Sequence, residues 1–173
     1  MNFLRNIYNW TLKKAENKNA KWYLSLIAFV ESSFFPIPPD ILLIPMALAS
    51  KARALFYALI CTIFSVLGGI LGYAIGYFFY NSVGIYIVEF YHLENSFSVF
   101  ENYYKEFGIL IVLGAGITPF PYKFITIASG VFGLNIFLFI IISIIGRGLR
   151  FYLIALLLYF FGEKIKLIID KYF

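Results

Sequence analysis

Long apolar stretches separated by short polar breaks run along most of the chain. A helix that crosses the hydrocarbon core of a bilayer needs about 20 consecutive apolar residues. Two stretches reach that length without a proline, 54–80 and 134–161. Shorter apolar pieces precede each of them, and prolines interrupt these pieces. The pattern predicts an all-α chain with two full transmembrane helices, each preceded by a broken apolar segment.

The first broken segment contains the sequence FPIPPD. Proline lacks the backbone N–H and its ring clashes with the preceding turn, so this cluster ends a helix. The apolar piece before it, WYLSLIAFVESSFF, would reach only about 21 Å as a helix. We predict a re-entrant hairpin over 22–50 that enters from the cytoplasm. The alternative, one broken helix that crosses the bilayer, disagrees with the charges of Lys51 and Arg53. The predicted tip is formed by Pro36, Pro38 and Pro39.

A second break, TPFPYK, repeats the frame of the first. Its tip prolines are Pro119 and Pro121, and short apolar pieces lie on both sides. We predict a second re-entrant hairpin over 108–133, followed by the helix 134–161. Since this hairpin enters from outside, the two units have opposite topology. Inverted repeats of this kind are typical of transporters, whose sites are formed by broken helices near the bilayer midplane.

Composition agrees with a membrane protein, because 62% of residues are hydrophobic and only 13% are charged. Soluble domains carry about 25% charged residues. We expect a single membrane domain over 22–162. Basic residues gather before residue 22, at 51–53 and at the end, whereas acidic residues gather in 81–107. The positive-inside rule therefore predicts cytoplasmic termini.

The polar segments follow from the same charge pattern. Residues 1–21 are expected to form a basic, amphipathic segment or to act as a topology signal alone. Residues 81–107 are expected to lie along the outer interface as an amphipathic helix, and 163–173 to form a cytoplasmic tail. Topology and anionic lipids account for the net charge of +5, so no nucleic-acid partner is expected.

Five ionisable residues fall in apolar surroundings, where each costs about 2.5–3.5 kcal/mol on insertion scales. They are Glu31, Asp40, Lys123, Arg147 and Arg150. The two acids are candidates for proton coupling. Asp40 directly precedes an apolar helix, so it could also serve as a helix N-cap. Lys123 stands where Asp40 stands in the first unit, and we expect it to pair with Asp40 or Glu31.

The remaining two candidates are arginines at positions i and i+3 of one helix. This spacing places them on the same face. Two guanidinium groups can bind a phosphate through paired hydrogen bonds, so Arg147, Arg150 and Lys123 are candidates for phosphate binding. An alternative for Arg150 is that it extends toward the cytoplasm to keep its charge hydrated.

Small residues recur in the helix 54–80 at Gly68, Gly72 and Gly76. This spacing predicts a helix-packing face, against either another helix of the chain or a second copy in a homo-oligomer. One cysteine and one histidine exclude a cysteine or histidine metal site within the chain. Because hydrolase and nucleotide-binding motifs are also missing, we expect neither an enzyme nor a cofactor.

Four stretches together resemble the DedA family of bacterial membrane proteins, also called the VTT or SNARE-associated Golgi protein family, and most closely its YqaA-like branch. They are FVESSFFPIPPDILLIPMALA, LGGILGYAIGYFFY, ITPFPYKFITIASGVFG and GRGLRFYLIALLLYFFG. The resemblance implies two facing re-entrant hairpins in the bacterial inner membrane. It also implies movement of phospholipids or undecaprenyl phosphate between leaflets, in some members driven by protons.

By position, the family's hairpin acids correspond to Glu31 and Asp40, and the basic residue of its second-hairpin motif to Lys123. Many members carry two arginines in that motif, whereas this chain has Ile117 near the other place. We hypothesise that Arg147 replaces the missing charge. The expected function is transport of a phosphate-headed lipid, with membrane lipids and protons as partners. Two alternatives stay open: a proton-coupled exporter of small ions or drugs, and a membrane assembly protein without transport.

Overall fold

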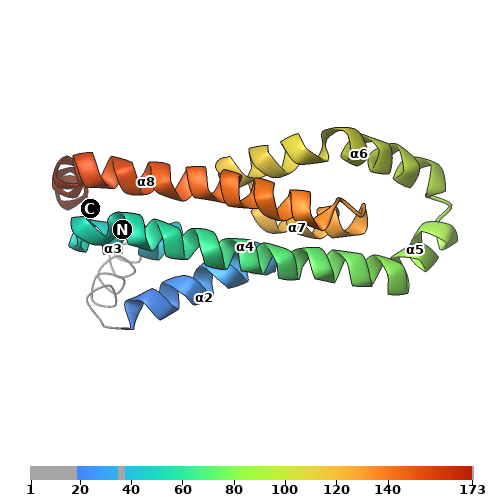
Figure 1. Ribbon diagram of the computed structural model, residues 1–173, viewed down its shortest axis with the longest axis horizontal. Helices are drawn as coiled ribbons and strands as arrows, with labels where there is room; N and C mark the ends of the chain where they lie inside the picture. Colours follow the sequence, from blue (N-terminus) through green and yellow to red (C-terminus); the bar gives the residue numbers. More distant parts are fainter. Residues whose placement is uncertain (1–18, 35–37, 173) are drawn as a thin grey trace.

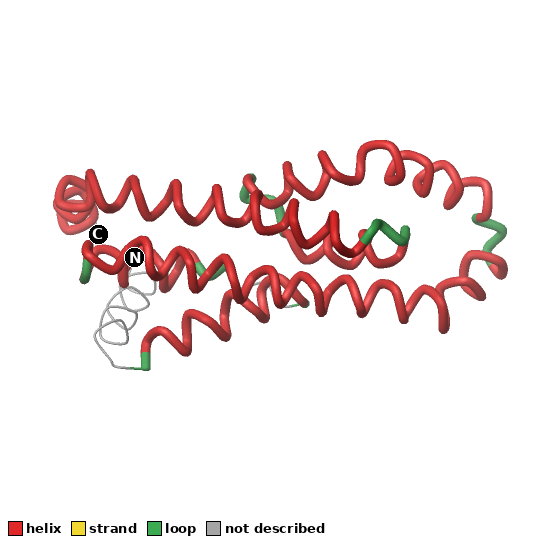
Figure 2. The backbone as a smooth tube through the Cα atoms, in the orientation of Figure 1, coloured by secondary structure: helices red, strands yellow, loops and turns green. Residues whose placement is uncertain are grey.

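The computed structural model describes residues 19–34 and 38–172, with side chains up to Gly162, and this part contains helices and no strand (Figures 1 and 2). The predicted N-terminal amphipathic segment lies almost entirely outside the described residues, as does Pro36. The helices are α2 (Ala20–Ser33), α3 (Asp40–Ala49), the short turn η1 (Lys51–Arg53), α4 (Ala54–Phe79), the π-helical turn η2 (Tyr80–Gly84), α5 (Ile85–Phe90), α6 (Glu94–Ile117), α7 (Tyr122–Val131) and α8 (Ile136–Tyr172).

Two long helical stretches are of sufficient length and apolar character to cross a membrane. They span Lys51–Phe90 and Ile136–Gly162. Within them α4 and α8 pack against each other along the molecule (Figure 1). Large apolar side chains cover their outer surfaces, and Phe137 and Phe160 are 74% and 70% exposed. The predictions of an all-α chain and of two long apolar helices are therefore confirmed.

The shorter helices divide into two groups along the long axis. Helices α2 and α3 lie beside one half of the α4–α8 pair, and α7 and most of α6 lie beside the other half (Figures 1 and 2). Helix α2 packs mainly on α4, and α6 packs mainly on α8. The second helix of each segment packs on the other long helix: α7 packs on α4, and α3 packs on α8. Each proline-broken segment thus contacts both long helices.

Glycines of α4 permit the close approach of its neighbours. A Cβ atom at Gly68 would overlap the backbone carbonyl of Phe29 in α2, and one at Gly76 would overlap that of Ile127 in α7. A Cβ at Gly72 would overlap the hydroxyl oxygen of Thr126. The predicted packing face therefore contacts helices of the same chain.

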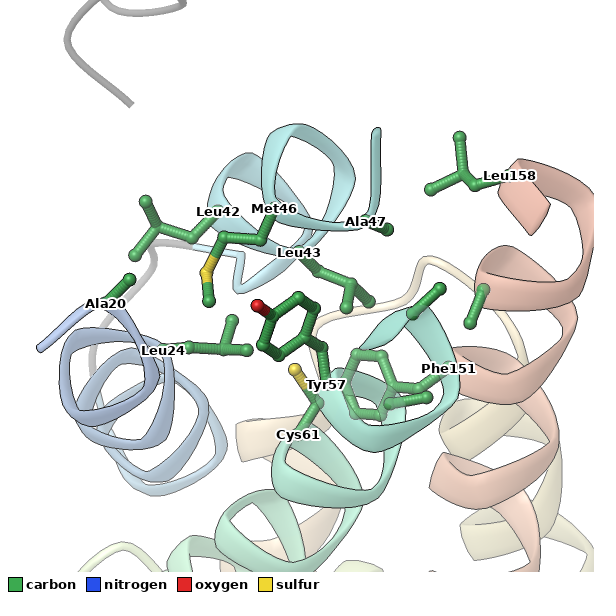
Figure 3. Close-up of a cluster of buried hydrophobic side chains, with 13 residues drawn as sticks. Ala20, Leu24, Leu42, Leu43, Met46, Ala47, Tyr57, Cys61, Phe151 and Leu158 are labelled. Atoms are coloured by element: carbon green, nitrogen blue, oxygen red, sulfur yellow. The ribbon is translucent and has the colours of Figure 1, made fainter. Parts of the chain in front are cut away.

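An apolar cluster joins the first broken segment to the long helices. Figure 3 shows Leu24 of α2, Leu43 of α3, Cys61 of α4 and Phe151 of α8, all buried, converging on one point. A second, smaller apolar cluster joins the second broken segment to α8. Its members come from α6, α7 and α8, and they are Val112, Ala115, Tyr122 and Phe139. Both broken segments are thus fixed by their own buried contacts.

Three predicted boundaries differ from the structure. The helix predicted over 54–80 continues through η2 and α5 to Phe90, into the expected outer segment 81–107. The rest of that segment and the first arm of the hairpin 108–133 form one continuous helix, α6. No proline lies between Glu94 and Ile117, so a change from polar to apolar residues did not end the helix. Likewise, α8 continues to Tyr172, past the predicted start of the tail.

Candidate functional site

Both arginines of α8 pair with carboxylates of the first broken segment. Arg147 Nη2 lies 2.7 Å from Glu31 Oε2, and Arg150 Nη2 lies 2.5 Å from Asp40 Oδ2. Glu31 comes from α2 and Asp40 from the start of α3. Because the arginines are one helical turn apart, the same face of α8 meets both arms of the segment. The structure thus brings four of the five predicted ionisable residues together as two ion pairs.

Arg147 is buried, with 1% of its side chain exposed. Its Nε donates to Ser65 Oγ at 2.5 Å, and Ser65 shares a hydrogen bond of 2.6 Å with Ser32. The Ser32 hydroxyl in turn donates to Glu31 Oε2 at 3.0 Å. These bonds form a closed ring with the Arg147–Glu31 pair, so both charges are compensated by groups of α2, α4 and α8.

Two aromatic rings complete the surroundings of Arg147. Its guanidinium carbon lies 5.0 Å from the centroid of Tyr122 and 4.7 Å from that of Phe151. A guanidinium at this distance from a ring face is attracted by the ring quadrupole. Arg147 Nη1 is buried and has no hydrogen-bond partner among the described residues.

Arg150 is partly exposed and links the two proline breaks. Its side chain is 14% exposed. Besides the pair with Asp40, its Nη1 donates to the carbonyl oxygen of Thr118 at 2.9 Å. Thr118 directly follows α6, at the second break. The guanidinium of Arg150 is therefore bound by both breaks.

Asp40 does not cap α3. The helix begins at Asp40 itself, Pro39 occupies the capping position, and no side-chain capping hydrogen bond is present. One carboxylate oxygen, Oδ2, is used by Arg150. The other, Oδ1, is buried without a hydrogen-bond partner among the described residues. The N-cap interpretation is wrong because the carboxylate turns toward α8.

Lys123 does not form the predicted ion pair with Asp40 or Glu31, and both carboxylates pair with arginines of α8 instead. Its ammonium lies 5.3 Å from the ring centroid of Phe124. Within the described part of the chain, Lys123 has no carboxylate within ion-pair distance. It therefore retains an uncompensated positive charge.

A cavity of about 380 Å³ lies between the two breaks, within the size range of small-ligand sites. Its polar lining consists of Glu31, Lys123 and Arg150, and Arg147 is not part of the lining. Prolines and aromatic rings form the rest of the lining, namely Pro38, Pro119, Phe120, Pro121 and Phe124. The cavity can therefore offer two cations and one carboxylate to a ligand. No cluster of metal-ligating side chains is present among the described residues.

Sequence reasoning missed the hydroxyl groups that hold the site together. Ser65 binds Arg147, and Tyr122 donates a hydrogen bond to Ser143 of α8. Thr126 of α7 donates to the carbonyl oxygen of Ser32 at 3.2 Å, which links the two broken segments directly. Single hydroxyls in apolar helices are common, since they bond to their own backbone. Only Ser32 could be identified from the sequence as a hydrogen-bonding hydroxyl, because it directly follows Glu31.

Two proteins resemble this chain over nearly its whole length. An uncharacterized protein of Haemophilus influenzae is 36% identical over 164 residues, which cover 95% of this chain and 85% of that protein. A Histophilus somni protein, "Uncharacterized protein HI0703 homolog", is 34% identical over 167 residues, with the same coverage. No family model matches the chain, and no solved structure matches it significantly. The chain belongs to the family that these two bacterial proteins represent.

Proposed function

We propose that the protein is a DedA-like, multi-pass transporter of the bacterial inner membrane that moves a phosphate-headed lipid between leaflets. The observation that carries the proposal is the cavity between the two breaks, lined by Lys123, Arg150 and Glu31. Ionisable residues inside a membrane domain are retained for function in most proteins, because their insertion is costly. Cations beside aromatic and proline side chains fit a headgroup that carries a phosphate.

The arrangement of the short helices supports an inverted repeat. In the proposal, α2–α3 and α6–α7 are re-entrant hairpins that enter from opposite sides. Helix α2 contacts α4 as α6 contacts α8, and α7 contacts α4 as α3 contacts α8. This exchange of partners is what a twofold axis in the membrane plane would produce. The two tips then meet near the midplane, where the cavity lies.

The residues divide their roles according to exposure. Lys123 and Arg150 line the cavity and bind the phosphate. Arg147 is enclosed by Glu31, Ser65 and Tyr122, so it positions Glu31 and does not contact the lipid. Glu31 and Asp40 take up and release protons, and loss of either ion pair frees one hairpin from α8.

Lipid translocation in liposomes tests the proposal. Purified protein is reconstituted with a trace of fluorescent phosphatidylglycerol, and the fraction accessible to an external quencher is followed with time. The protein is expected to accelerate exchange between leaflets, and Lys123→Gln to slow it at least tenfold, the effect of losing ~1.4 kcal/mol of binding in the rate-limiting state. Equal rates with and without protein would refute the proposal.

Lys105→Gln provides the matched control. Lys105 lies on α6 with 63% of its side chain exposed and pairs with Glu101. It carries the same charge as Lys123 but lies outside the cavity lining. Translocation by this variant should equal that of the unaltered protein. An equal loss in both variants would indicate that net charge, and not the cavity, controls the rate.

A further inference from the structure

The charges around the cavity do not balance. Arg147 and Arg150 compensate Glu31 and Asp40 one to one. Lys123 has no such partner among the described residues. Three cations against two carboxylates leave a single surplus positive charge at the site. In surroundings of low dielectric constant an uncompensated charge is unfavourable, and a ligand of opposite charge removes the imbalance.

The other titratable groups packed against the site do not alter this count. Cys61 of α4 and Tyr122 of α7 interact electrostatically with Glu31 and Arg147. A thiol and a phenol are neutral at pH 7 unless their surroundings stabilise the anion. Directly after α6, the carbonyl oxygen of Thr118 accepts a hydrogen bond from Arg150. This group is uncharged, so it does not change the count.

We propose that the cavity selects a phosphate group with one negative charge, that is, a phosphodiester headgroup. A phosphomonoester carries nearly two negative charges at pH 7 because its second pKa is about 6. Its binding would leave the site with one negative charge too many, so it binds together with one proton. This inference rests on the proposed function, since it specifies the headgroup that the same cavity accepts.

The phosphate of the monoester itself accepts that proton, which is taken up from solution, because its second pKa of about 6 lies close to neutral pH. One proton therefore enters per monoester bound, and none enters with a diester. The proton count therefore distinguishes the two classes of headgroup.

Calorimetry on the full chain in detergent measures this count directly. Phosphatidylglycerol, a diester, and phosphatidic acid, a monoester, are titrated in buffers with different ionisation enthalpies. Phosphatidylglycerol is expected to bind with no proton uptake and with constant affinity from pH 6 to pH 8. Phosphatidic acid is expected to take up one proton, and its affinity to fall about tenfold per pH unit above pH ~6.

Soluble probes show whether the ligand is a lipid headgroup or a free phosphate compound. Glycerophosphoglycerol and glycerol phosphate carry the same diester and monoester without acyl chains. If the lipid is the ligand, these probes bind much more weakly but show the same proton counts. If they bind as tightly as the lipids, the cavity accepts free phosphate compounds, and the charge rule still applies.

Substitutions change the count in opposite directions. Lys123→Gln removes the surplus charge, so phosphatidylglycerol should now require one proton and bind at least about tenfold more weakly at pH 8. Asp40→Asn adds one positive charge, so phosphatidic acid should bind without a proton. Lys123→Arg keeps the charge and should behave as the unaltered protein does. These variants act on different helices, so a folding defect in one leaves the other informative.

Two results would overturn the inference. Phosphatidic acid that binds at pH 8 as tightly as phosphatidylglycerol without proton uptake would contradict the charge rule but leave lipid transport intact. Phosphatidylethanolamine, a diester whose headgroup has no net charge, should bind more weakly than phosphatidylglycerol, and equal binding would also contradict it. If no lipid binds, both this inference and the proposed function fail.

Discussion

Arg147 combines nearly complete burial with several polar and aromatic neighbours, although its Nη1 has no hydrogen-bond partner among the described residues. Its partners are Glu31, Ser65 and the rings of Tyr122 and Phe151. A buried ion pair gains attraction in a low dielectric but loses the hydration of both charges. Removal of one partner is therefore far more harmful than removal of both, because it leaves the other charge buried and uncompensated.

This asymmetry gives a stability prediction. Arg147→Gln should lower the free energy of unfolding by about 3 kcal/mol, since Glu31 stays charged without its partner and only 12% of its side chain is exposed. The double variant Glu31→Gln with Arg147→Gln should regain a large part of that loss. Thermal unfolding in one detergent, followed by circular dichroism, measures both. If the double variant is less stable than either single variant, the two side chains are not energetically coupled.

The sequence was sufficient to select the charged residues of the site but not to pair them. Glu31, Asp40, Lys123 and Arg150 stood out because charges are rare in apolar helices. The repeated proline frame favoured a pair between Asp40 and Lys123. The structure pairs Asp40 with Arg150, because the face that α8 turns toward the first segment depends on how three helices cross. That geometry is not encoded in a local pattern.

Helix α4 serves as the common packing surface for α2 and α7. The backbone carbonyl of Phe29 lies where a Cβ of Gly68 would be, and that of Ile127 lies where a Cβ of Gly76 would be. Backbone atoms cannot move aside as a flexible side chain can. One methyl group at either position therefore forces the helices apart, which reduces the contacts of both broken segments with α4.

Alanine substitutions test this surface. Gly68→Ala and Gly76→Ala should each lower the free energy of unfolding by about 1–3 kcal/mol, the usual cost of overpacking. Gly114→Ala in α6 is the matched control, because a Cβ there meets nothing within 4 Å. It should be neutral or slightly stabilising, since alanine favours a helix more than glycine does. Thermal unfolding in detergent compares the three variants, and equal losses would exclude close helix approach as the cause.

The continuity of α6 shows where sequence patterns fail for helices. The change from polar residues to the apolar piece that starts at Gly108 predicted a boundary, yet the helix runs from Glu94 to Ile117. Polarity reports what surrounds a residue, whereas helix ends depend on prolines, caps and left-handed residues. The observed break before α6 contains His92, whose φ of 52° is unfavourable for a non-glycine residue. No local signal identified that position.

The whole molecule is organised so that its two broken segments lie beside opposite halves of the long helices (Figure 1). If a broken segment is a re-entrant hairpin, the chain before it and the chain after it lie on the same side of the membrane. If the segment is a broken helix that crosses the bilayer, the chain before it and the chain after it lie on opposite sides. The predicted topology and its main alternative therefore differ at specific, labelled positions.

Single cysteines decide between them. Cys61 is buried and is first replaced by alanine. New cysteines are then introduced at Ser50, before η1, at His92, before α6, and at Asn135, before α8. The inverted-repeat topology predicts that an impermeant maleimide added outside intact cells labels His92→Cys and Asn135→Cys, whereas Ser50→Cys reacts only after the inner membrane is permeabilised. Labelling of His92→Cys but not Asn135→Cys from outside would show that α6 and α7 cross the membrane as one broken helix, and the paired hairpins would have to be abandoned.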